Sequence, residues 1–101
     1  MGQPLELQER LETILGSENV YFEPPTGTQM TYPCIVYERD SMKTKFANNL
    51  PYSRMNRYLI KVIDRRPQGP VSEKVEELPT CVYVRSYVSD GLHHTLYNLY
   101  N

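Results

Sequence analysis

The sequence of 101 residues has no tryptophan and only two phenylalanines, two cysteines and two histidines. Its aromatic content is mostly tyrosine, with nine residues, and tyrosine suits positions that are dry on one side and wet on the other, as at protein interfaces. No apolar run approaches the ~20 residues that span a bilayer, and no signal-peptide pattern opens the chain. We therefore expect one soluble domain, residues 1–101, made in the cytosol and without a membrane partner.

Patterns that carry catalysis or metal binding are also missing. The sequence has no glycine-rich phosphate loop, no G-x-S-x-G and no H-E-x-x-H. His93 and His94 are adjacent, and neighbours in a strand point to opposite faces, so both cannot serve one site. Cys34 and Cys81 lack zinc-ligand spacing and are expected to be free buried thiols, although a disulfide would be feasible if their strands were neighbours. We predict no enzymatic activity, no cofactor and no metal site.

Residues 4–16 predict an amphipathic helix with both ends marked. Pro4 suits the first helical turn, and Gly16 suits the C-terminal cap. The apolar positions follow i, i+4, i+7 and i+8, which places them on one helical face: Leu7, Leu11, Ile14 and Leu15. The next stretch, SENVYFEPP, looks like a protease site for removing affinity tags, but a purification linker has no reason to carry such a helix. We interpret the helix as part of the domain.

The remaining pattern predicts five strands and a second helix. The strands are expected at Val20–Glu23, Pro33–Arg39, Tyr52–Asp64, Thr80–Val88 and Leu92–Tyr100, and the helix at Pro70–Leu78. Alternation places Tyr58, Ile60 and Val62 on one face of the third strand. It places Tyr83, Arg85 and Tyr87 on one face of the fourth, with Val82, Val84 and Val88 on the other. The expected fold class is α+β: an antiparallel or mixed sheet flanked by two helices, in the order α-β-β-β-α-β-β.

Charge is divided unevenly along a nearly neutral chain. Residues 39–66 hold eight basic and two acidic residues, a net +6, whereas the rest holds three basic and ten acidic residues, a net −7. The basic region could face nucleic acid, because neutralising phosphates is the sequence-independent part of DNA binding. Alternatively, basic and acidic surfaces of successive copies could meet head to tail, which builds rings or filaments. A third interpretation is that these charges only keep a loop and an edge strand soluble.

Charge and aromatic pattern together nominate an interface for oligomers, for a tube or for a lumen. Tyr and Arg are enriched at interface centres. Leu59 and Ile63 flank Lys61 on one face of the third strand, and a face that met only water would carry fewer large apolar side chains. A long loop, 40–52, is expected to become ordered on assembly because it carries apolar groups. The candidate interface residues are Met42, Lys43, Lys45, Phe46, Arg54, Arg57, Lys61, Arg65, Arg66, Tyr83, Arg85 and Tyr87.

The chain also resembles a known family over nearly its whole length. The segments ILGSENVYFEPPTGTQMTYPCIVYERD and NRYLIKVIDRRPQGPVSEKVEELPTCVYVRSYVSDGLHHTLYNLY resemble small tail-completion, or head–tail joining, proteins of long-tailed bacteriophages, relatives of the lambda-type tail terminator. The most telling pieces are YPCIVYE, VIDRRP and DGLHHTLYNLY. They are not catalytic signatures.

This resemblance implies a mixed α/β subunit that forms a ring, expected to be a hexamer, on the head-proximal end of the tail tube. The implied partners are further copies of the chain, the tail tube protein, the head connector or stopper protein, and DNA passing through the lumen without sequence recognition. The implied location is the head–tail junction of the virion, after assembly in the host cytoplasm. Two alternatives stay open: a head-closure or connector-adaptor protein of the same junction, and a small nucleic-acid-binding module.

Overall fold

The computed structural model describes residues 5–40, 57–67 and 69–100. Its elements are α1 (Leu5–Leu15), β1 (Val20–Phe22), β2 (Cys34–Asp40), β3 (Arg57–Asp64), α2 (Pro70–Glu76), β4 (Cys81–Ser89) and β5 (Leu92–Tyr100). This confirms the predicted α+β class and element order. The predicted loop 40–52 and the first residues of the predicted third strand lie outside the described residues, except that Asp40 ends β2.

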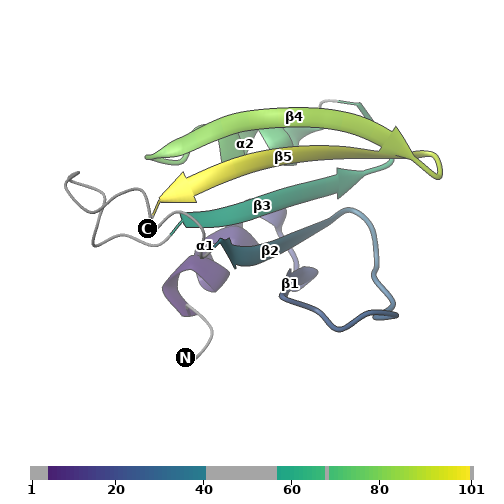
Figure 1. Ribbon diagram of the computed structural model, residues 1–101, viewed down its shortest axis with the longest axis horizontal. Helices are drawn as coiled ribbons and strands as arrows, with labels where there is room; N and C mark the ends of the chain where they lie inside the picture. Colours follow the sequence, from purple (N-terminus) through teal and green to yellow (C-terminus); the bar gives the residue numbers. More distant parts are fainter. Residues whose placement is uncertain (1–4, 41–56, 68, 101) are drawn as a thin grey trace.

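The five strands form one open sheet in the order β1-β2-β3-β5-β4 (Figure 1). β1 runs parallel to β2, and the other neighbouring pairs are antiparallel, so the sheet is mixed. β4 and β5 form a hairpin closed by a turn at Asp90 and Gly91, where both residues have positive φ. The long strand β4 is therefore an edge of the sheet.

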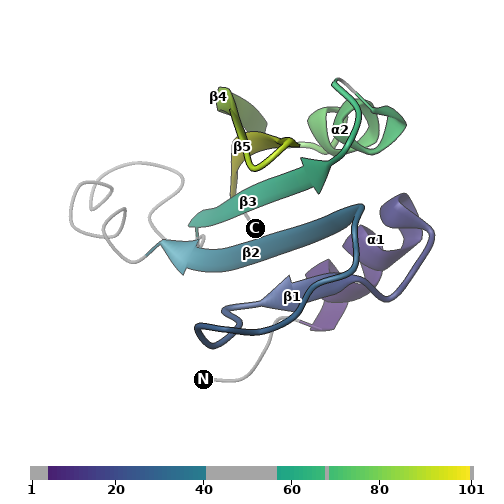
Figure 2. The ribbon, with the colours of Figure 1, turned by 90° about the vertical axis from the view of Figure 1, so that its right-hand side faces the viewer.

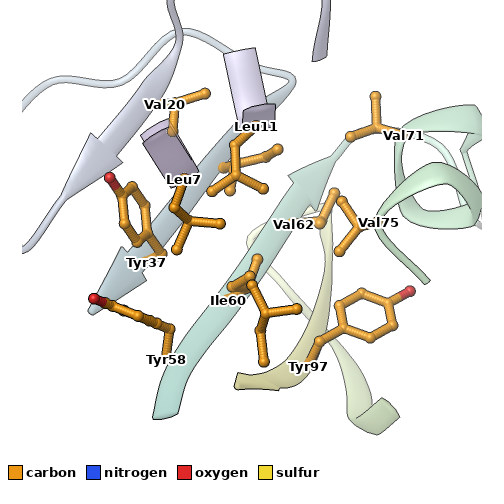
Figure 3. Packing of buried hydrophobic residues seen from close by; sticks show 12 residues of the cluster. Leu7, Leu11, Val20, Tyr37, Tyr58, Ile60, Val62, Val71, Val75 and Tyr97 are labelled. Carbon is orange, nitrogen blue, oxygen red and sulfur yellow. The ribbon is translucent and has the colours of Figure 1, made fainter. Parts of the chain in front are cut away.

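Both helices pack on one face of the sheet (Figure 2). α1 contributes Leu7 and Leu11 to the core, and α2 contributes Val71 and Val75 (Figure 3). The buried strand residues of the same cluster are Val20, Ile35, Tyr37, Tyr58, Ile60, Val62, Tyr97 and Leu99. The predicted alternation of β3 is confirmed, because its even-numbered residues form the middle of this core. We call the opposite side, which carries no helix among the described residues, the helix-free face.

Polar contacts as well as apolar packing tie α1 to the sheet. The hydroxyl of Tyr37 donates to Oε1 of Gln8 at 2.6 Å, and Nε2 of Gln8 donates to the carbonyl of Val20 at 3.0 Å. Gly16, with φ of 81°, closes the helix by donating its N–H to the carbonyl of Glu12 at 2.8 Å. The helix is thus an integral layer of the domain, as the cap signals in the sequence predict.

Several element ends differ from the sequence prediction by one or two residues. α2 ends at Glu76 rather than Leu78, because the N–H of Leu78 folds back onto the carbonyl of Val75 in a tighter turn. β4 begins at Cys81, since Thr80 has a positive φ of 64°. None of the described helices is long and apolar enough to cross a membrane.

The two cysteines are free and cannot meet within the sheet. Cys34 lies on β2 and Cys81 on β4, and these strands are separated by β3 and β5. Since adjacent strands are about 4.8 Å apart, the backbones of β2 and β4 lie well beyond disulfide reach. The condition that would have made a disulfide feasible is therefore not met.

Candidate assembly surface

The edge strand β4 is the most exposed part of the sheet. Four of its large apolar side chains are open to solvent: Val82 at 56 %, Tyr83 at 51 %, Val84 at 42 % and Val88 at 62 % of their full exposure. Its outer main-chain groups face away from the sheet, because β5 is its only neighbour among the described strands. Exposed edges of this length are ready templates for pairing with another chain. β4 is therefore the first surface to examine for a partner.

A β-bulge divides β4 into two halves. Tyr83 pairs with Tyr97, but Arg85 pairs with Leu96, so Val84 is the extra residue without a partner on β5. A bulge inserts one residue and shifts the alternation of everything beyond it. The bulge also increases the local twist of the edge, which is a common way to limit uncontrolled pairing.

The bulge makes the predicted face assignment of β4 wrong. Tyr83 lies on the helix side with its partner Tyr97, whereas Arg85 and Tyr87 lie on the helix-free face with Leu96 and His94. The valines are divided in the same way, with Val82 on the helix-free face and Val88 on the helix side. Strict alternation would have kept each set together, and the single extra residue at Val84 separates them.

Basic side chains collect on the helix-free face. Lys61 of β3 and Arg85 of β4 both pair with Leu96 of β5, so they lie in one cross-strand row about 10 Å apart. Arg57 lies on the same face nearer the start of β3, and Glu38 of β2 lies on this face as well. Neither Lys61 nor Arg85 forms an ion pair with a carboxylate of the described residues.

Tyr87 and His94 form an aromatic platform beside this cationic row. Their rings stack at 4.6 Å between centroids with only 6° between planes. The guanidinium of Arg85 lies 5.3 Å from the centre of the Tyr87 ring, a cation–π distance. Burial, and secondarily the charge of Lys61, lowers the pKa of His94. The helix-free face thus combines fixed positive charge with ring surface.

A polar groove lies on the other side of the same hairpin. It has a volume of about 410 Å³ and runs between α2 and the β4–β5 strands. Its lining residues are Ser72, Glu73, Glu76, Tyr83, Ser86, Thr95 and Tyr97. A second hollow continues along the hairpin and adds Val88 and His93 to the shared residues Tyr83, Ser86 and Thr95. The groove therefore offers hydroxyls, two tyrosine rings and two carboxylates to a partner.

Internal contacts hold the walls of this groove in place. The hydroxyl of Tyr97 donates to the carbonyl of Ser72 at 3.2 Å, and Tyr83 packs edge-on against Tyr97 at 6.0 Å. The hydroxyls of Tyr83 and Ser86 lie 3.0 Å apart. Burial first, and then the Glu76 carboxylate, raises the pKa of Tyr97. The negative charge of the groove therefore acts on the Tyr97 hydroxyl beside it.

The structure describes seven of the twelve predicted interface residues. Met42, Lys43, Lys45, Phe46 and Arg54 lie outside the described residues. Arg57, Lys61, Arg85 and Tyr87 share the helix-free face. Arg65 and Arg66 are exposed in the turn after β3, where Nε of Arg66 lies 3.8 Å from Asp64. Tyr83 lies on the helix side. The structure thus brings four of the twelve together on one face.

The sequence analysis did not predict the polar groove between α2 and the β4–β5 hairpin, which we call the acidic groove because Glu73 and Glu76 line it. In the sequence, Glu73 and Glu76 are two of several charged residues in a short helix, and Ser86 and Thr95 carry no local signal. Only the pairing of β4 with β5 and the packing of α2 bring these residues together. The stacking of His94 on Tyr87 likewise depends on the shifted register beyond Val84.

Comparison of the chain with protein-family models, curated proteins and solved structures finds no match. No group of three or more His, Cys, Asp or Glu side chains within the described ranges is arranged to hold a metal ion. The described part of this surface presents an apolar edge strand, fixed charges, hydroxyl groups and aromatic rings.

Proposed function

We propose that this chain is a structural subunit that assembles head to tail into a closed ring. In that proposal it is the tail terminator of a long-tailed phage, located at the head-proximal end of the tail tube. The phage context rests on the resemblance of segments such as YPCIVYE and DGLHHTLYNLY. The assembly part rests on one observation, the exposed apolar edge strand β4.

The edge supports self-assembly because the bulge interrupts it at one point only and leaves apolar side chains exposed on both sides of that point. A free monomer with four half-exposed apolar residues on one long edge strand risks uncontrolled pairing. Covering that edge with a neighbouring copy removes the risk. A heterologous contact repeated around a rotation closes into a ring, in which every copy is covered.

The role in the particle follows from what a ring at the end of a tube can do. It stops further addition of tube subunits and presents a new surface to the head connector or stopper protein. DNA passes through its lumen, and no base recognition is needed. The proposed role is structural, not enzymatic.

Capping of tail tubes is the direct test. Tube protein encoded by the same genome should polymerise into long tubes alone and into tubes with an added end ring when this chain is present, as seen by negative-stain electron microscopy. Tyr83→Asp with Val88→Lys, which places charges on the exposed edge, should abolish the end ring. Tubes that grow equally long and stay uncapped with the wild-type chain would contradict the proposal.

A connector adaptor of the same junction is a second candidate, and it differs in what it binds. An adaptor should bind the head connector in the absence of tubes, whereas a terminator should bind tube ends in the absence of the connector.

The cationic row of Lys61 and Arg85 beside the Tyr87–His94 stack favours a third candidate, a nucleic-acid module. Salt-dependent binding of short DNA at physiological ionic strength would favour that third candidate.

A further inference from the structure

We propose that the ring contact joins two different surfaces of the chain: the helix-free face of one copy, through Lys61 and Arg85, docks into the acidic groove of the next copy, through Glu73 and Glu76. This inference rests on the proposed function, because it assumes that the partner is a second copy. The inference goes further than ring formation, because it identifies which two surfaces of the chain meet in the contact.

The acidic side of the proposed contact is a groove lined by two carboxylates that no cation of the described residues neutralises. Glu73 and Glu76 are exposed on α2 and make no ion pair with a cation of the described residues. The groove beside them, of about 410 Å³, is large enough for one or two long side chains. Its Tyr83 ring is half exposed and offers a cation–π surface beside the carboxylates.

The basic side is the row of Lys61 and Arg85, whose positive charge is complementary to the carboxylates of this groove. Lys61 and Arg85 lie on adjacent positions of the sheet, either side of Leu96, and lack carboxylate partners within the described part of the chain. Val82 lies 56 % exposed on the same face, next to Arg85 along β4. The two surfaces therefore pair cation with anion and also bring apolar groups together.

A second copy suits this row better than a nucleic acid does. The chain carries its own complement, because the helices on the opposite side hold Glu6, Glu9, Glu12, Glu73 and Glu76 against Arg10 and Lys74. Its total charge is −1, which provides no net attraction for phosphates. Opposite charges on opposite sides favour a head-to-tail contact and oppose a symmetric pairing of like faces.

Charge exchange tests the pairing of these surfaces. Glu73→Lys with Glu76→Lys, and separately Lys61→Glu with Arg85→Glu, should each raise the concentration needed for self-association at least about tenfold, because like charges then meet across the contact. The variant carrying all four changes should regain association, and so should an equimolar mixture of the two double variants. Sedimentation velocity over a concentration series measures each case.

A matched variant controls for charge, and an unfolding measurement controls for folding. Glu18→Lys with Thr26→Lys and Gln29→Lys adds the same +4 as the groove variant, at exposed positions outside both surfaces, and should associate like the wild type. Thermal unfolding verifies that each double variant is folded, and the mixture provides the rescue test should the fourfold variant fail to fold.

The outcomes separate this inference from the proposed function. A wild type that caps tubes while the double variants associate normally would leave the proposed function standing and overturn the inference. Loss of association without rescue in the mixture would also overturn it, as would a wild type that stays monomeric at every concentration. If Lys61→Glu with Arg85→Glu lost binding to short DNA but kept normal self-association, the cationic row would be a nucleic-acid contact and the inference would be overturned.

Discussion

At the scale of single residues, the helix-free face contains a group whose protonation opposes folding. His94 is stacked on Tyr87 and lies near Lys61, and its pKa is lowered relative to that of an exposed histidine. Both burial and the neighbouring ammonium group disfavour a second positive charge there. The unfolded chain consequently binds this proton more readily than the folded one.

This difference predicts a pH-dependent stability. Because the folded-state pKa is lowered, the free energy of unfolding should be constant above the unfolded pKa of about 6.5 and should fall as the pH drops below it. His94→Asn should remove that fall. Urea unfolding between pH 5 and pH 8 measures it, with His93→Asn on the opposite face as the matched control. An unchanged fall in His94→Asn would contradict this account.

At the scale of elements, α1 is a structural layer whose removal should unfold the domain. Leu11 is fully buried in the main cluster, whereas Leu5 of the same helix is 68 % exposed. Leu11→Ala should therefore lower the free energy of unfolding by about 2–5 kcal/mol, and Leu5→Ala by less than about 0.5 kcal/mol. Equal effects in chemical denaturation would show that α1 does not pack as described.

The bulge in β4 yields a second prediction at this scale. Deleting Val84 should leave every other residue of β4 on its present side, because Val84 is the residue without a partner on β5. Deleting Val88 instead should turn Arg85 and Tyr87 to the helix side, since the strand then loses its extra residue at another point.

Thermal unfolding and self-association separate these two deletions. The Val84 deletion should keep a stability within about 1 kcal/mol of the wild type, with stronger non-specific association because the edge is straighter. The Val88 deletion should lose specific association, since it moves Arg85 off the helix-free face. Indistinguishable behaviour of the two deletions would argue against the bulge at Val84.

Much of the fold could be predicted from sequence because its signals are local. The helix face of Leu7 and Leu11, the alternation of Tyr58, Ile60 and Val62, and the opposite orientation of the two histidines depend on neighbours within one element. The face assignment of β4 failed because a bulge depends on the partner strand and leaves no mark in the alternation. The groove escaped prediction for a similar reason, since α2 and β5 meet only in three dimensions.

At the scale of the whole molecule, charge is sorted by layer rather than by sequence window. Arg39 belongs to the basic window but lies on the helix side, where Nη2 donates to the Tyr58 hydroxyl at 3.3 Å. Arg85 lies outside the window and yet joins Lys61 on the helix-free face. The described part of the molecule therefore has a cationic sheet face and an acidic helix layer, and this polarity is the physical basis of the head-to-tail proposal.

Native mass spectrometry of the wild-type chain over a concentration series tests this central claim most directly. Head-to-tail assembly with closure predicts a passage from monomer to one ring, near the six copies that the resemblance implies, with few intermediates. A stable dimer that grows no further would contradict it, because a two-fold pair uses the same patch on both copies and leaves no surface from which a ring could be built.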